Sequence, residues 1–323
     1  MIPLHFMLID GNSVGYANQY SHTLTSQGMQ VQAISGTLRS ISRRIREYPD
    51  FFPIVLWDGR AQWRFDLYAD YKSNRLKSES SRAARAAYEK QQPYLRIMAE
   101  KLGLTQIVAP CAEADDVGYQ LALILLSMGH KVLFVTSDTE WLQGYQEGLS
   151  WLDPKTDKFI ASASDMEAHV GTSDPRAYIE AKALAGDTSD TIAGVPRIGI
   201  TTALKVFAQF GGSMDAFYAH AEAGKVDLKK KTLNSLASAE GRAIFARNMK
   251  LMDLAAAPKL TESEIVVSRE PVDHIVFTDW AEHFSFSSIL KNVGEFISPF
   301  ERSTEHLGFG EMQRAVAALS ARS

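Results

Sequence analysis

Short apolar runs and amphipathic stretches alternate along the first half of the chain. Mostly apolar runs bounded by turn residues predict buried strands at residues 5–10, 52–57, 106–109 and 131–136. Between them, apolar residues at helical spacing predict helices at 33–48, 82–101 and 113–128, and a hairpin is predicted at 151–160. Strands that alternate with helices favour an α/β fold, with a mainly parallel central sheet flanked by helices on both faces.

After residue 161 the pattern becomes mostly helical. Helices are predicted at 176–185, 201–210, 213–223 and 242–254. Asp174 followed by Pro175 indicates a helix start, and Ser164 with Glu167 indicates a capping box. We therefore expect an α/β core at residues 1–161, a helical subdomain packed on it at 162–303, and a C-terminal helix or tail at 304–323.

Composition indicates an ordinary globular protein, with 46% hydrophobic and 22% charged residues among 323. The net charge of -4 does not indicate nucleic-acid binding, but an acidic site would offset a basic surface in that sum. The single cysteine, Cys111, excludes an internal disulfide and a cysteine-based zinc site. The chain shows neither a signal-peptide pattern nor an apolar run of spanning length, so we expect a cytoplasmic protein without a membrane partner.

Nine carboxylates gather in five short stretches of the chain. They are Asp10 in LIDGN, Asp58 in VLWDG, Glu113, Asp115 and Asp116 in EADD, Asp138 and Glu140 in TSDTE, and Asp187 and Asp190 in GDTSD. Asp10, Asp58 and Asp138 each follow a predicted strand, which would bring them to one edge of a parallel sheet. One stretch alone is explained by a helix start or a turn. All five together favour a metal-dependent nuclease, because Mg²⁺ prefers carboxylate oxygens and paired ions commonly serve phosphodiester cleavage.

A basic segment at residues 72–101 carries eight Lys or Arg residues against three Glu. Such a run is often only a solvated helix face, but it also suits contact with a phosphate backbone. Lys72 and Arg75 are the candidates for the scissile phosphate, since a nearby cation stabilises transition-state charge. Tyr71 is a candidate for stacking on a base, although an aromatic residue beside a basic run commonly only packs.

A glycine-bounded turn, GVPRIG at residues 194–199, precedes the helix predicted at 201. A turn of this kind exposes backbone N–H groups that can hold a phosphate without reading base sequence. The alternative is a simple connection between two helices.

Together these motifs resemble the 5′-nuclease superfamily, which comprises flap endonucleases, phage 5′→3′ exonucleases and the 5′-nuclease domains of bacterial DNA polymerases. The resemblance covers about residues 5–210 and rests on LIDGN, VLWDG, DYKSNR, EADD, VTSDTEWLQ and GDTSDTIAGVPRIGITTALK. It implies a site for two Mg²⁺ or Mn²⁺ ions. By motif position, one side would comprise Asp10, Asp58, Glu113, Asp115 and Asp138, and the other Glu140, Asp187 and Asp190, with Asp116 close by.

The resemblance also implies a helical arch at about residues 72–101, with Lys72 and Arg75 at its foot. A helix-hairpin-helix element at about 187–210 would grip duplex DNA, in the family often with a bound K⁺. Its contact residues would be Gly194, Arg197, Gly199, Thr201 and Lys205. Three positions depart from the usual motifs: Glu140 stands for Asp, Arg197 for Gly, and Ile200 for an acid.

We therefore expect a 5′→3′ exonuclease or flap endonuclease that hydrolyses DNA at 5′ ends, flaps and duplexes by a two-metal mechanism. RNA primers in hybrids and replication proteins are further partners to consider, in a bacterial cell or a phage-infected host. Three alternatives stay open: a catalytically inactive, structure-specific DNA-binding protein, an RNA-directed metallonuclease, and a metal-dependent phosphatase.

Overall fold

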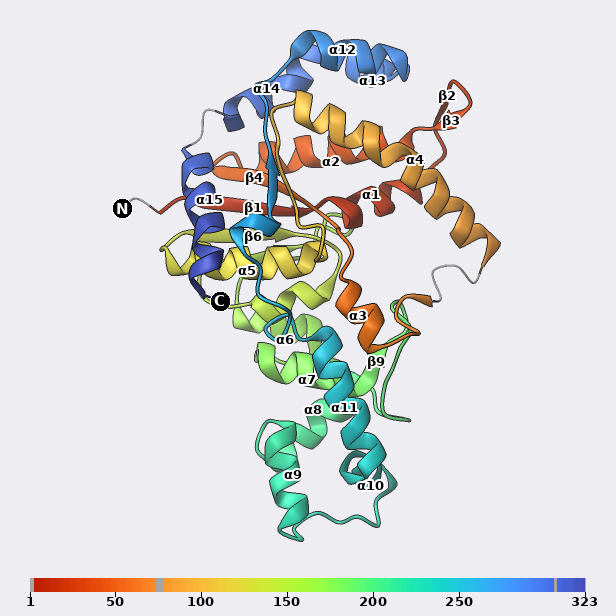
Figure 1. Cartoon of the computed structure of the whole chain (residues 1–323), viewed down its shortest axis with the longest axis vertical. Coiled ribbons are helices and arrows are strands. Elements are labelled where there is room, and N and C mark those ends of the chain that lie inside the picture. Colours follow the sequence, from red (N-terminus) through yellow and green to blue (C-terminus); the bar gives the residue numbers. More distant parts are fainter. Residues whose placement is uncertain (1–2, 74–77, 305–306, 323) are drawn as a thin grey trace.

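A seven-stranded sheet forms the centre of the molecule in the computed structural model, which describes residues 3–73, 78–304 and 307–322 (Figure 1). The strand order is β11 (Val266–Ser268), β5 (Thr105–Val108), β4 (Phe51–Trp57), β1 (His5–Asp10), β6 (Lys131–Val135), β7 (Leu149–Leu152) and β8 (Phe159–Ile160). The five inner strands are parallel, and only the edge strands β11 and β8 pair antiparallel. The predicted α/β class is confirmed.

Helices cover both faces of this sheet, because side chains alternate along each strand. In β1, Phe6 and Leu8 join the core on one face, while Met7 and Ile9 join the core on the other. The first face is covered by α5 (Ala114–Ser127) and α15 (Gly308–Ala317). The second is covered by α1 (Gly11–Gln19), α2 (Gln32–Glu47), α4 (Glu79–Lys101), α12 (His274–His283), α13 (Ser287–Leu290) and α14 (Val293–Thr304).

A helical part extends away from the sheet at the bottom of Figure 1. It contains α7 (Pro175–Ala185), α8 (Ile200–Phe210), α9 (Met214–Glu222), α10 (Lys231–Ala237) and α11 (Ala239–Met252). Its separate small core includes Phe207, Phe210 and Phe217. Helix α6 (Ala163–Val170) packs against β8 and buries Met166 in the core of the sheet. Asp174 caps α7 as predicted, but the capping box of α6 is formed by Ser162 and Asp165. The predicted pair Ser164 and Glu167 is wrong by two residues, because the helix begins earlier and the shorter Asp165 makes the same reciprocal bonds.

The chain returns to the sheet after this helical part. β11 pairs with β5, α14 packs on α2, and α15 packs on α5. We expected residues 162–303 to form the helical subdomain, and the structure differs from residue 266 onward. The reason is that Phe277, Ile289 and Phe300 bury their side chains in the sheet's own core, and helical periodicity alone does not say which surface a helix covers.

Short elements complete the fold and place residues of the site. They are β2 (Thr25–Ser26), β3 (Met29–Gln30), α3 (Gln62–Leu67), η2 (Thr139–Gly144), β9 (Gly186–Asp187), β10 (Ile192–Ala193), η3 (Glu262–Glu264) and η4 (Ala318–Arg322). Helix α4 runs unbroken through Pro93, and its first half projects beyond the sheet as the described part of the predicted arch (Figure 1). No described helix combines the length and apolar character that a membrane crossing requires.

Candidate active site

A cavity of about 690 Å³ opens at the carboxyl ends of the parallel strands. Its wall includes residues of α1, of the first turns of α4 and of the β9–β10 hairpin. Eight of the nine predicted carboxylates line it: Asp10, Asp58, Glu113, Asp115, Asp138, Glu140, Asp187 and Asp190. The structure thus brings together acids that are up to 180 positions apart in the chain.

The sheet-edge side of the cavity consists of acids that end strands or begin helices. Asp10 ends β1 and accepts hydrogen bonds from the Ser13 N–H at 2.8 Å and the Thr136 hydroxyl at 3.0 Å. Asp58 follows β4 and accepts from the Ala114 N–H at 2.9 Å, which ties it to the start of α5. Asp138 follows β6, so parallel pairing alone places these acids at one edge.

The EADD stretch divides between the cavity and the protein interior. Asp115 lines the cavity, whereas Asp116 turns inward, where each of its oxygens accepts a bond of 2.7 Å from the buried Arg64 guanidinium. Asp116 also accepts from the Glu113 N–H at 3.1 Å and so caps α5. The expectation that Asp116 joins the ligand set is therefore corrected: it lies outside the cavity, and its oxygens are already bound.

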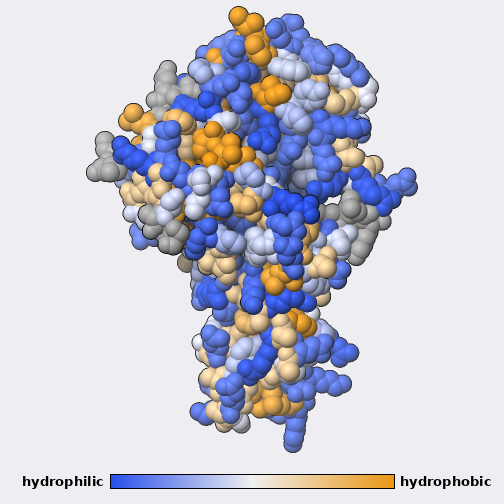
Figure 2. All heavy atoms as spheres, viewed as in Figure 1, coloured by the Kyte–Doolittle hydropathy of each residue, from blue (hydrophilic) through white to orange (hydrophobic). Residues whose placement is uncertain are grey.

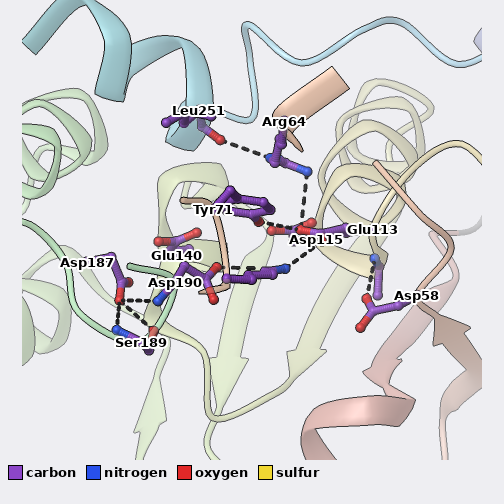
Figure 3. Close-up of polar contacts among 12 residues, drawn as sticks. Asp58, Arg64, Tyr71, Glu113, Asp115, Glu140, Asp187, Ser189, Asp190 and Leu251 are labelled. Carbon is purple, nitrogen blue, oxygen red and sulfur yellow. Dashed lines mark hydrogen bonds and ion pairs between the residues drawn. The ribbon is translucent and has the colours of Figure 1, made fainter. Parts of the chain in front are cut away.

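The second side of the cavity is a loop braced by side chains, shown at the left of Figure 3. Asp187 and Asp190 lie on the β9–β10 hairpin, where the Ser189 N–H donates to Asp187 at 2.7 Å. Lys182 of α7 lies 2.6 Å from Glu140 and 3.2 Å from Asp187. The sequence interpretation missed Lys182, and the only signal for it is a basic residue shortly before the GDTSD motif.

Lys72 lies between the two sides. Its ammonium is 2.5 Å from the Glu113 carboxylate and 3.7 Å from that of Asp190. The backbone N–H of Lys72 donates to the Asp190 carbonyl at 2.8 Å. Tyr71 beside it is only 4% exposed and donates its hydroxyl to Glu113 at 2.8 Å. The expectation that Tyr71 stacks on a base is corrected, because its ring is packed inside the protein. Arg75 lies outside the described residues.

Burial dominates the electrostatics of the cavity. Burial, with repulsion from Asp58, raises the pKa of Asp10 to about 7. Burial, with repulsion from Asp138, likewise raises the pKa of Glu140 to about 7, and the pKa of Asp115 lies well above its usual range because of burial and Asp116. Burial acts against ionised Glu113, yet Lys72 and Arg64 hold its pKa below the usual value. The cavity therefore contains carboxylates that gain from any added positive charge.

The donor set fits hard divalent cations, since it offers carboxylate oxygens from both sides of one cavity. Within the described ranges, however, no three His, Cys, Asp or Glu side chains converge into a compact ligand group. Glu113 is turned towards Lys72, and Glu140 and Asp187 are turned towards Lys182. Ion binding at both sides would therefore require some of these carboxylates to reorient.

The turn before α8 presents polar groups to solvent. Arg197, Gly199, Thr201 and Lys205 are exposed, and no side chain caps α8 at Gly199. At position 194 the packing requires glycine, because a Cβ there would lie 2.1 Å from the Ala185 carbonyl oxygen. Arg197 adopts a left-handed backbone with φ of 66°, as its place in a turn that usually contains Gly predicts.

Two family models match the chain. The first, 5′-3′ exonuclease, N-terminal resolvase-like domain, matches residues 5–171, and the second, 5′-3′ exonuclease, C-terminal SAM fold, matches residues 173–271. The chain belongs to the 5′-3′ exonuclease family. The predicted resemblance and the expectation of a nuclease are confirmed.

Curated relatives of this chain include an exonuclease that it matches over most of its length and a much longer DNA polymerase. A 5′-3′ exonuclease of Buchnera aphidicola is 31% identical over 208 residues, which is 63% of this chain and 70% of that protein. A thermostable DNA polymerase I of Thermus filiformis is 31% identical over 211 residues, which is 65% of this chain but 24% of the polymerase. The chain thus spans about a quarter of the length of that polymerase.

Solved structures support the fold. The phage T5 5′-exonuclease with bound zinc ions superimposes with a TM-score of 0.67 at 19% identity, covering 92% of this chain and 100% of that one. The catalytic core of Rad2 in complex with DNA substrate superimposes with a TM-score of 0.59 at 15% identity, covering 92% and 93%. At these identities the likeness shows the shared architecture.

Proposed function

We propose that this chain hydrolyses DNA phosphodiester bonds at 5′ ends and flaps, with divalent ions held in the acidic cavity. The observation that carries this proposal is the convergence of eight carboxylates on one 690 Å³ cavity, with Lys72 between its two sides. The bound zinc of the T5 exonuclease structure and the DNA substrate of the Rad2 structure support it.

Two Mg²⁺ or Mn²⁺ ions are the proposed cofactors. Asp10, Asp58, Glu113, Asp115 and Asp138 would hold one, and Glu140, Asp187 and Asp190 would complete the site for the other. When bound, such ions offset charge on the phosphate and lower the pKa of the attacking water. The buried acids favour this uptake, because each is held with its charge poorly solvated.

Lys72 is the proposed partner of the scissile phosphate. Its ammonium lies at the cavity wall, and its position is fixed by its own backbone bond to Asp190 rather than by a flexible stem alone. A preplaced cation stabilises charge that develops in the transition state. By the resemblance, Arg75 supplies a second cation from the same run.

The turn at 194–199 and the start of α8 are the proposed duplex contact. The exposed N–H groups of the α8 N-terminus, with Thr201, Arg197 and Lys205 beside them, suit phosphate oxygens, and K⁺ is the further ion that the resemblance allows here. Figure 2 shows hydrophilic side chains projecting from the edges of the narrow part of the molecule that α8–α11 form. Binding there should be salt-sensitive and indifferent to base sequence.

A cleavage assay tests the proposal. A 5′-labelled flap, a nicked duplex, a blunt duplex and a duplex with an RNA 5′ end are compared in Mg²⁺, Mn²⁺ and EDTA. We expect cleavage of the DNA substrates only with a divalent ion. Asp115→Asn should lose about a hundredfold or more of the rate, on the scale of a lost electrostatic contact, while still binding DNA.

Other outcomes would contradict the proposal. Cleavage in EDTA, or an undiminished rate for Asp115→Asn, would exclude the metal-dependent mechanism. DNA binding without cleavage under every condition would favour the inactive binding protein, and cleavage confined to the RNA-containing substrate would favour the RNA-directed nuclease.

A further inference from the structure

Arg64 of α3 is a buried arginine whose side chain bonds to the start of α5 and to α11. The residue is 2% exposed. Its two terminal nitrogens each donate to Asp116 at 2.7 Å, and one also lies 3.4 Å from Glu113. Its Nε donates to the Leu251 carbonyl of α11 at 3.0 Å, so the guanidinium lies between α11 and the start of α5 (Figure 3).

These contacts fix how the first turn of α5 presents its acids. Asp116 is held by two parallel bonds and in turn accepts the Glu113 N–H at 3.1 Å. Asp115 lies between these two residues and points into the cavity. The direction of the Asp115 and Glu113 side chains therefore depends on where Arg64 holds Asp116.

Helix α11 also holds the other side of the cavity. The Arg247 side chain stacks 4.4 Å over the Tyr68 ring and donates to the Ala193 carbonyl at 2.6 Å. The neighbouring Asn248 donates to the carbonyls of Ala183 and Ala193, at the end of α7 and in β10. One helix thus braces the β9–β10 hairpin with two side chains and anchors Arg64 with its backbone.

We propose that Arg64 is a positioning residue that aligns the two sides of the acidic cavity by linking Asp116 of α5 to α11. This inference rests on the proposed function, in which both sides hold ions. Arginine suits this role because its planar fork makes two parallel bonds to one carboxylate and a third bond in another direction. A lysine presents all its N–H groups from one nitrogen, so it cannot reproduce the two parallel bonds to Asp116 and the separate bond to Leu251.

Arg64→Lys tests the proposal, with Arg44→Lys as the matched control. Arg44 of α2 has a side chain that is 3% exposed, and it bonds to Glu47, Asp157 and the Pro154 carbonyl, away from the cavity lining. Mn²⁺ binding is measured by the loss of the free-ion paramagnetic resonance signal, and kcat and KM are measured separately on a flap substrate.

We expect Arg64→Lys to weaken Mn²⁺ binding by about tenfold to a hundredfold, the usual effect of losing a residue that supports a metal ligand. The value of kcat should fall while KM for DNA stays near that of the wild type, because the duplex contact at α8 is untouched. Arg44→Lys should lower only the melting temperature and leave Mn²⁺ binding, kcat and KM unchanged.

Asp116→Asn provides the second variant and decides the question if Arg64→Lys does not fold. It keeps the side-chain shape but loses the charge that Arg64 holds, so it should also weaken Mn²⁺ binding. The proposal is overturned if the folded variants lose stability but bind Mn²⁺ and turn over like Arg44→Lys. A wild-type protein that neither binds Mn²⁺ nor cleaves would instead contradict the proposed function.

Discussion

The two sides of the acidic cavity are built in different ways. On the sheet-edge side, Asp10 ends one parallel strand and Asp58 and Asp138 follow two others, and backbone pairing sets their positions. On the other side, Asp187 and Asp190 lie on a hairpin of two-residue strands. Side chains from α7 and α11 hold that hairpin in place. The first side is therefore placed by the fold itself, and the second by a small number of long-range contacts.

This difference has opposite consequences for stability. Asp10 is buried at the sheet edge beside Asp58, so burial and mutual repulsion act directly on the free energy of unfolding. Acids on a braced hairpin are relieved by Lys182, which holds the pKa of Asp187 below its usual value against the effect of burial. Asp10 should therefore make stability depend on pH, whereas the β9–β10 hairpin should respond mostly to loss of its braces.

The largest effect is expected for Asp10→Asn in EDTA. The pKa of Asp10 is raised from 3.8 to about 7 in the folded protein, so the folded state binds more protons than the unfolded state between those values. Stability should therefore fall as pH rises through this window. Asp10→Asn lacks this carboxylate, so its free energy of unfolding should decline less as pH rises. Relative to the wild type, the variant should become more stable by a few kcal/mol at most between pH 5 and pH 8.

Urea unfolding at several pH values measures this gain. Asp279→Asn, which changes an exposed acid of α12, is the matched control and should follow the wild-type curve. Parallel curves for Asp10→Asn and the wild type would show that the buried carboxyl does not penalise the folded state.

A smaller and more local effect is expected for Asn248→Ala on the hairpin side. Asn248 is 0% exposed and donates to the Ala183 carbonyl at 2.7 Å and to the Ala193 carbonyl at 3.0 Å. Without it, the Ala183 carbonyl loses its buried donor, which typically costs about 1–3 kcal/mol, while the Ala193 carbonyl keeps its bond from Arg247. Hydrogen exchange should accelerate at residues 186–193 and stay unchanged in β1. Uniform acceleration across both regions would mean that the two sides do not open independently.

The same contrast explains how much the sequence could predict. Strand ends followed by Asp are visible as a local pattern, and they correctly predicted which acids meet at the sheet edge. The pattern could not separate Asp115 from Asp116. Side chains of successive helical residues point about 100° apart around the axis, and only the position of Arg64 shows which of the two faces inward. Nor could it show that Tyr71 is buried, since its partner Glu113 lies 42 positions along the chain.

The smallest effect is expected for Arg197, which follows the hairpin in the turn towards α8. Its φ of 66° places a side chain where glycine is usually preferred, at a cost of roughly 1 kcal/mol. Arg197→Gly should therefore gain up to about 1 kcal/mol of stability, partly offset by the greater freedom of glycine in the unfolded chain. Arg197→Ala keeps the strained backbone and should show no such gain.

Both variants should weaken duplex binding and reduce the salt slope by about one phosphate contact. Thermal unfolding and a duplex-binding salt series, measured on both variants, separate the backbone effect from the charge. If both variants bound duplex DNA with the wild-type salt slope, the turn would be a connection between helices and not a phosphate contact.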